Sequence, residues 1–211
     1  MKTKTIPVSS YELDFIQWAK CAEAVEAGPS TQEPINELLA EHHIMDAVLA
    51  AMEREARRLS VHGELRTDYW ERVVDFVGNY VHQCHRRKEE RALQMANERY
   101  QAVEAGPMAM ITRDHEQAHR LTWDLYNGVS DGDWEKVLRA AHLYLRVIRD
   151  HMIRVERYVF EPARDVLTPE DAADLRRQFD ETEREALGER NRAYYLDVAR
   201  SLCRDAGLSS L

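Results

Sequence analysis

Cysteine is scarce in this sequence, and the three present are Cys21, Cys84 and Cys203. Their wide spacing excludes a disulfide framework and a paired-cysteine metal site, so we expect a reducing, cytoplasmic location. Cys84 adjoins His85, which leaves two alternatives for it: a small buried apolar thiol or a functional group. The buried thiol is the favoured interpretation.

Glycine and proline are also few, at 8 and 6 residues, whereas charged residues make up 32% of the chain. This composition is typical of a mostly helical domain. Long apolar runs are missing, and residues 1–7 contain no apolar segment of a secretion signal, so neither membrane insertion nor secretion is expected. A basic excess is missing too. The net charge of −9 argues against nucleic acid as a partner, because phosphate binding requires a basic face. The basic run at 86–88 is flanked by acids and is interpreted as solvated helix surface.

Apolar residues recur at helical spacing in four long stretches, which begin near Ser30, Thr67, Met108 and Trp134. Their breaks are Gly63, Gly106-Pro107, Asn127-Gly128 and Pro162. We therefore predict an all-α fold: an up-down-up-down four-helix bundle over residues 30–165. An appendage, residues 1–29, precedes it. Residues 166–211 add two further helices, one ending near Leu187 and one spanning 191–205, which we assign to packing or assembly.

Each of the four long stretches carries imidazole or carboxylate side chains in phase with its apolar stripe. Residues four apart on a helix point the same way, so these side chains are expected to face the bundle interior. A single such histidine is more often a packed core residue, but five in phase are not explained by packing. Four helices that direct donors inward describe a dinuclear metal site. The predicted ligands are His42, His85, Glu89, His115, His119, His151 and Glu156.

One spacing does not fit an ideal helix. Glu156 follows His151 by five residues, which places the two side chains about 140° apart around an α-helix. Glu156 reaches the site only if the helix widens locally, as in a π-bulge, or if its side chain swings round. Glu41 and Asp114 are predicted to accept hydrogen bonds from ligand histidines on neighbouring helices. His43 is expected at the surface or behind the ligands.

Imidazole and carboxylate ligands suit iron, zinc and copper. If both carboxylates bridge two octahedral ions that also share an oxide or hydroxide, the five imidazoles leave one coordination position open. A single open position predicts an asymmetric site at which a small exogenous molecule binds one metal.

The order of these motifs, H…HxxxE…HxxxH…HxxxxE, resembles the ligand pattern of the hemerythrins. The surrounding residues are similar to the HHE cation-binding, hemerythrin-like family over residues 34–165. The matching segments are EHHI at 41–44, CHRRKEE at 84–90, DHE at 114–116 and FEP at 160–162. At His119 and Val155 the chain looks more like an oxygen-binding hemerythrin than like many other members of that family, whereas its last acid is Glu rather than Asp.

The resemblance implies a non-haem site of two iron ions bridged by oxo or hydroxo. It implies that His42 and His85 bind one iron and that Glu89 and Glu156 bridge the pair. The ligands implied for the second iron are His115, His119 and His151.

Three functions follow as hypotheses. The first is a cytosolic di-iron protein that binds or senses a diatomic ligand, dioxygen first and nitric oxide second. The second is a redox enzyme acting on nitric oxide or peroxide, or an iron-sulfur cluster repair factor, although such factors carry a cysteine-bearing N-terminal motif and this chain has only Cys21 there. The third is a regulatory module holding zinc or no metal. In that case the C-terminal helices bind a protein partner, and a homo-oligomer is a further alternative.

Overall fold

The computed structural model describes residues 34–101 and 105–208, and the structural statements below refer to them. Within these ranges the chain is helical apart from short connections and contains no strand, which confirms the predicted all-α class. The predicted appendage (1–29) and the predicted helix start near Ser30 lie outside the described residues.

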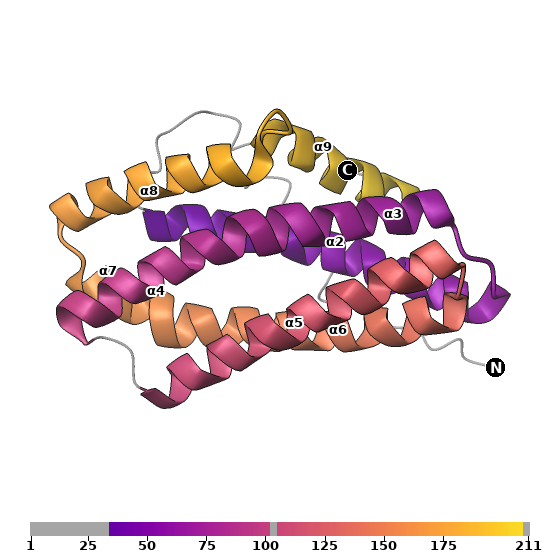
Figure 1. The fold of residues 1–211 in the computed structure, drawn as a ribbon, viewed down its shortest axis with the longest axis horizontal. Helices are drawn as coiled ribbons and strands as arrows, with labels where there is room; N and C mark the ends of the chain where they lie inside the picture. Colours follow the sequence, from indigo (N-terminus) through magenta and orange to yellow (C-terminus); the bar gives the residue numbers. More distant parts are fainter. Residues whose placement is uncertain (1–33, 102–104, 209–211) are drawn as a thin grey trace, which may run out of the picture.

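Long helical columns run back and forth along the molecule. The first is α2 (Pro34–His62), and the second joins α3 (Thr67–Asp75), the π-helical segment η1 (Phe76–His85) and α4 (Arg86–Tyr100). Next come α5 (Ala105–Asp131) and a column made of α6 (Trp134–Val155), the π-helical segment η2 (Glu156–Phe160) and α7 (Glu161–Val166). Figure 1 shows successive columns running in opposite directions.

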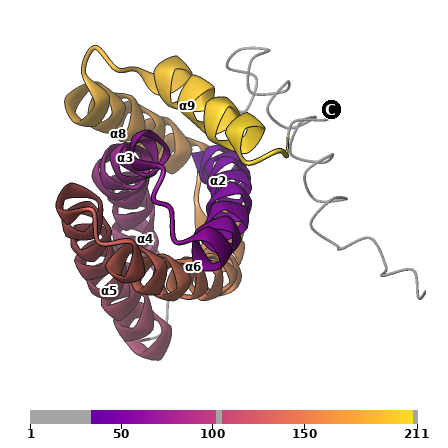
Figure 2. The same ribbon diagram turned by 90° about the vertical axis from the view of Figure 1, so that its right-hand side faces the viewer.

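Two further helices, α8 (Pro169–Leu187) and α9 (Arg192–Asp205), lie along one side of these columns, over α2 and α3 (Figure 2). They are part of the packed interior, because buried side chains from both contribute to the apolar clusters formed by the columns. The helix positions agree with the sequence prediction of one helix ending near Leu187 and one over 191–205. No helix in the described ranges is long and apolar enough to cross a membrane.

Local signals set most helix ends. Thr168 and Asp171 form a reciprocal capping box at the start of α8, and Gly188 ends that helix with a φ of 56°. The predicted end of the second column at residue 105 is wrong. α4 ends at Tyr100, after which Gln101 adopts a left-handed conformation with a φ of 49°. Gly106-Pro107 instead occupy the first turn of α5, where a proline is tolerated.

The predicted break at Asn127-Gly128 is also wrong, since α5 continues to Asp131. Gly128 is needed there for a different reason. A Cβ atom on Gly128 would lie 2.9 Å from Cγ2 and 3.0 Å from the backbone nitrogen of Val137. The glycine therefore allows the end of α5 and the start of α6 to approach closely.

Two segments are wound more widely than an α-helix. In η1 the N–H of Arg86 bonds to the carbonyl of Val81, and in η2 the N–H of Glu161 bonds to the carbonyl of Glu156, both five residues back. From the sequence, a π-bulge was one of two alternatives near Glu156, whereas the π-helical segment η1 was not predicted. Such turns shift the phase of the side chains that follow, and they gather at functional sites.

The interior consists of two apolar clusters with a polar layer between them. On α2, Leu38 belongs to the smaller cluster and Ile44 to the larger, and His42 lies between them. The same alternation occurs on the second column, where Cys84 and Ala92 flank the polar positions. Because this layer is enclosed at both ends by packed apolar side chains, its charged groups are shielded from water.

Candidate metal centre

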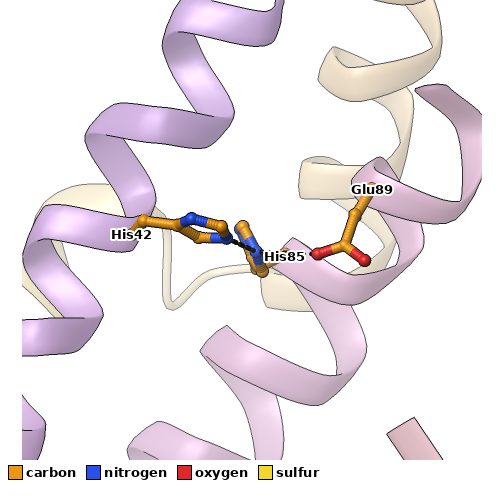
Figure 3. A group of neighbouring side chains, drawn as sticks. All are labelled: His42, His85 and Glu89. Carbon is orange, nitrogen blue, oxygen red and sulfur yellow. Dashed lines mark hydrogen bonds and ion pairs between the residues drawn. The ribbon is translucent and has the colours of Figure 1, made fainter. Parts of the chain in front are cut away.

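Glu89 occupies the centre of the polar layer and is completely buried. Three imidazole Nε2 atoms lie around its carboxylate. His115 Nε2 is 3.1 Å from Oε1, whereas His151 Nε2 and His85 Nε2 are 3.3 Å and 3.5 Å from Oε2. A fourth, His42 Nε2, is 3.1 Å from His85 Nε2. Figure 3 shows His42 and His85 facing each other, with Glu89 beside them.

The donors form two groups that share Glu89. In each group, one ligand atom per residue lies within 4.8 Å of the others. His42 and His85 complete the first group, and His115 and His151 complete the second. Each group thus offers two imidazoles and one carboxylate. Oε2 of the shared carboxylate lies near a histidine of each group, His85 and His151, whereas Oε1 lies near His115 of the second group.

The outward-facing nitrogen of each of these four imidazoles is directed at a second carboxylate. The Nδ1 of His85 donates to Glu41 Oε2 at 2.8 Å, which is the hydrogen bond to a neighbouring helix predicted for Glu41. Asp114, for which the same was predicted, lies 3.8 Å from His151 Nδ1, too far for a hydrogen bond but within ion-pair distance. The remaining pairs are His42 Nδ1 with Glu156 Oε1 at 2.7 Å and His115 Nδ1 with Glu90 Oε1 at 3.3 Å. Carboxylates in this position orient metal-binding histidines and make them better donors.

These outer hydrogen bonds determine whether each inner nitrogen carries a proton or a lone pair. Because His42 and His85 each donate through Nδ1, each ring carries a lone pair on Nε2 when it is neutral. Two lone pairs facing each other at 3.1 Å repel unless a proton or a metal ion lies between them. Two nitrogens each about 2.1 Å from one ion, at a right angle, are about 3 Å apart. The spacing therefore fits a shared ion.

Without a metal, protons balance the charge of Glu89. Burial opposes ionisation of Glu89, but the charges of His151 and His115 outweigh it and hold the pKa of Glu89 well below its usual range. Burial also disfavours a charged His151, yet Glu89 and Asp114 raise the pKa of His151 to about 9. His42 differs, because burial dominates and lowers its pKa to about 4. The second group therefore holds its protons tightly, while His42 is neutral at pH 7.

Several polar atoms of the layer have no hydrogen-bond partner although they are buried. They are Glu89 Oε1, His115 Nε2 and His151 Nδ1. Leaving such atoms unsatisfied costs about 1–3 kcal/mol each. Two of them, Glu89 Oε1 and His115 Nε2, face the second donor group, so a cation bound there would satisfy both. The donors present therefore fit a pair of metal ions.

Five of the seven predicted ligands are thus brought together: His42, His85, Glu89, His115 and His151. Glu156 lies outside both groups. Its half-exposed carboxylate accepts from the outer nitrogen of His42, so it orients that ring from behind instead of lying between the groups.

His119 also lies outside both groups. It is exposed one turn beyond His115 on α5, where its Nε2 accepts a hydrogen bond from Trp123 Nε1 at 3.3 Å. Both residues line an open cavity of about 710 Å³ between α5 and the α3–η1 column. α5 keeps ordinary α-helical winding from His115 to His119, and the His119 side chain lies on the wall of this cavity.

His82 on η1 also lines that cavity. It is buried, and its Nε2 donates to the Thr122 hydroxyl at 2.8 Å, which in turn donates to the carbonyl of Ala118. Burial lowers the pKa of His82 to about 3, so it is neutral. Trp123 lines the cavity, whereas Tyr80 and Tyr144 are fully buried core residues.

Cys84, near the end of η1, is a buried thiol of the larger apolar cluster, as favoured from the sequence. Burial raises its pKa to about 12, which leaves it protonated and unreactive. His43 is exposed, in line with the surface alternative.

The sequence interpretation of Lys88 as solvated surface is wrong. Its side chain is completely buried beside the polar layer, where its ammonium contacts three carboxylates. Helical phase contained the signal, since Lys88 lies four residues after Cys84 and three after His85 on the inward stripe. The charged residues on either side of Lys88 made it look like part of an exposed basic run.

Comparison with known proteins gives no family for this chain: no family model, no curated protein and no solved structure matches it.

Proposed function

We propose that this chain is a hemerythrin-like four-helix-bundle protein whose polar layer holds two iron ions and binds a small diatomic molecule, dioxygen or nitric oxide. One observation carries the proposal. The buried carboxylate of Glu89 lies between two pairs of imidazoles whose inner nitrogens face one another and whose outer nitrogens are directed at carboxylates.

The donor types favour iron. Two imidazoles and one carboxylate with open positions are the ligand set typical of non-haem Fe(II) sites. His42 and His85 would hold one ion, His115 and His151 the other, and Glu89 would join them. When bound, the two irons supply the electrons that a diatomic ligand accepts on binding.

The surrounding residues prepare the site for a small neutral ligand. Three protein donors per ion leave coordination positions free, and the two apolar clusters limit the water that reaches the layer. Hydrogen bonds to Glu156 and Glu41 hold the rings of His42 and His85, so neither of these imidazoles is free to act as a mobile general base. Binding of a ligand is therefore favoured over hydrolytic chemistry.

A redox enzyme acting on peroxide or nitric oxide is the second candidate, and the placement of His119 and Glu156 favours it. Full ligation by all seven predicted residues leaves one open position. With those two outside the donor groups, more positions are open, and a site with several open positions can accept a substrate and exchange water at the same time.

The test is to measure iron per chain together with the optical spectrum, first reduced without air and then after air is admitted. His42→Ala is the diagnostic variant, and His43→Ala is its matched control, since the neighbouring His43 is exposed. We expect about two irons per chain and a reversible new absorption band on oxygenation in the wild type and His43→Ala, with both lost or reduced in His42→Ala.

Two irons that oxidise without a reversible band would favour the redox enzyme, and turnover of peroxide or nitric oxide would then identify the substrate. A chain that takes up no iron under these conditions, or the same amount with and without His42, would refute the proposed site.

A further inference from the structure

A second buried charged cluster adjoins the candidate metal centre. The ammonium of Lys88 lies 2.9 Å from Glu37 Oε1, Glu41 Oε1 and Glu183 Oε2. An ammonium has three N–H donors, so each is used by a different carboxylate. Lys88 is therefore a fixed, fully bonded cation.

The three carboxylates lie close enough together to resemble a metal site themselves. The Lys88 ammonium occupies the space between them, so this cluster already contains its cation. Its other members come from the C-terminal helices. Arg176 of α8 contacts Glu37, and Arg192 of α9 lies 3.3 Å from Glu37 Oε1 and 3.7 Å from Glu41 Oε1.

The cluster is electrically balanced. Its three cations, Lys88, Arg176 and Arg192, face three carboxylates. The ring of Phe179 on α8 also lies 5.9 Å from the Lys88 ammonium. Balanced charge and a carboxylate partner for every donor of Lys88 are what make the buried ammonium tolerable in the interior. Helices α8 and α9 are thus tied to the polar layer by charge as well as by apolar packing.

Glu41 connects this cluster to the metal centre. Its Oε1 accepts from Lys88, and its Oε2 accepts from His85 Nδ1 at 2.8 Å. Lysine can only donate, so Oε1 must remain an acceptor. The second oxygen is thereby held toward His85, the proton stays on Nδ1, and the Nε2 lone pair is directed at His42 and Glu89.

We propose that Lys88 is a positioning residue for the metal centre, acting through Glu41, and that α8 and α9 belong to that centre because they hold Lys88. The proposal rests on the proposed function for the identity of the site. Since two linked equilibria affect each other equally, metal binding and docking of the C-terminal helices stabilise each other.

Glu41→Gln tests the connection. Lys88 requires an acceptor, so the carbonyl oxygen of the glutamine faces Lys88 and its NH₂ group faces His85. An NH₂ group cannot accept the Nδ1 proton, which must move to Nε2, the atom needed for metal binding. Loss of such an outer partner typically lowers metal affinity by 10- to 100-fold, and we expect a loss in this range.

The double variant Glu41→Gln/Lys88→Met separates positioning from general damage. Without Lys88 the glutamine is free to turn its carbonyl oxygen toward His85, which returns the proton to Nδ1. We therefore expect the double variant to bind metal more tightly than Glu41→Gln alone. If both residues served only packing, the two losses would add, and the double variant would bind more weakly.

Two readouts are needed. Zn²⁺ affinity, measured by competition with a coloured chelator, reports the metal centre. Nitrogen-15 NMR of the histidine rings reports whether His85 carries a proton on Nδ1, with or without metal. We expect that Nδ1 proton in the wild type, its absence in Glu41→Gln and its return in the double variant. A wild type that binds no Zn²⁺ or iron would refute the proposed function, yet the NMR measurement would still test the positioning.

Glu183→Gln tests the role of α8 by a milder change, and Glu185→Gln is its matched control. Glu185 lies two residues further along α8 and pairs with Arg87 at 2.6 Å across the same α4–α8 contact, but on the exposed surface. We expect Zn²⁺ affinity to fall several-fold in Glu183→Gln and to stay unchanged in Glu185→Gln. Wild-type affinity in a folded Glu183→Gln, a retained Nδ1 proton in Glu41→Gln, or no recovery in the double variant would overturn the proposal.

Discussion

Raising the pH should destabilise the metal-free protein, and the candidate metal centre explains why. The buried Glu89 carboxylate is balanced by protons on the imidazoles around it, principally on His151. Removing those protons leaves Glu89 charged and buried with no compensating cation. The perturbation is therefore a change from about pH 7 to about pH 9.5 in the presence of a chelator.

The magnitude follows from His151. Its pKa rises from 6.5 to about 9 in the folded chain. Because the folded-state pKa is the higher one, the stabilisation is complete below about pH 6.5 and is lost as the pH rises through about 9. One pKa unit corresponds to about 1.4 kcal/mol, so the complete loss is about 3 kcal/mol in the free energy of unfolding, of which about 2 kcal/mol falls between pH 7 and pH 9.5. The raised pKa values of His85 and His115 act in the same direction.

Opposing groups act in other pH ranges. His42, whose pKa is lowered to about 4, makes the folded chain gain stability as the pH rises from about 4 to about 6.5. Glu89 loses its contribution only in acid, well below its usual pKa. Between pH 7 and about pH 9 the imidazoles that face Glu89 therefore dominate. Above about pH 9 the buried Cys84 and Cys203 thiols, whose pKa values are raised by burial, add to the loss.

Urea unfolding followed by circular dichroism measures this effect at each pH, and Glu89→Gln is the control. Without the carboxylate the main cause of the raised His151 pKa is gone, so most of the loss between pH 7 and about pH 9 should disappear. Metal affinity should change in the opposite direction and increase with pH, because a bound metal displaces the same protons. A metal-free wild type whose free energy of unfolding stays constant or rises between pH 7 and pH 9.5 would refute this account of the layer.

Three further predictions concern single side chains. His119→Ala should leave the metal content unchanged while His115→Ala lowers it, because only His115 faces Glu89; metal analysis of the two purified variants decides, and an equal loss in both would assign His119 to the site after all. Gly128→Ala should lower the free energy of unfolding by about 1–3 kcal/mol, because the added methyl meets the Val137 backbone. Gly78→Ala, with open space around the added methyl, should raise the free energy of unfolding by up to about 1 kcal/mol. Thermal unfolding of both variants tests the pair, and similar shifts would contradict the packing described. Lys88→Met should lower the free energy of unfolding by about 3–5 kcal/mol, because it leaves buried carboxylates without their cation. Arg87→Met removes only a surface pair and should change the free energy of unfolding by less than about 1 kcal/mol. A small effect of Lys88→Met in urea unfolding would show that the cluster rearranges.

The donor residues could be found in the sequence because helical phase is a local property. His42 lies in the apolar stripe of α2, and His85 and Glu89 share one face four residues apart, so their inward direction needs no knowledge of the partner helices. The same holds for His115 and His151. Helix ends are local too, and the end of α8 was predicted near Leu187, where the helix stops before Gly188.

Helical phase does not predict the contacts of a side chain where the helix winding changes, or where the helix borders an open cavity as well as the polar layer. η2 begins at Glu156 itself, and in the folded chain that carboxylate meets the outer nitrogen of His42. His119 has the correct spacing from His115, yet it lies on the wall of the cavity beside Trp123. The spacing of residues fixes the direction in which a side chain leaves its helix, whereas the neighbouring helices determine which groups that side chain contacts.

The sequence by itself determined the helical class, most helix positions and the five donors that converge, since each depends on residues within a few turns of one another. Only the tertiary structure decided the partners of Lys88. Glu37 and Glu41, Lys88, and Glu183 come from three different helices, and no local pattern relates them. Burying a lysine is unfavourable until all three carboxylates and the covering helices are in place, so this part of the site is a property of the assembled fold alone.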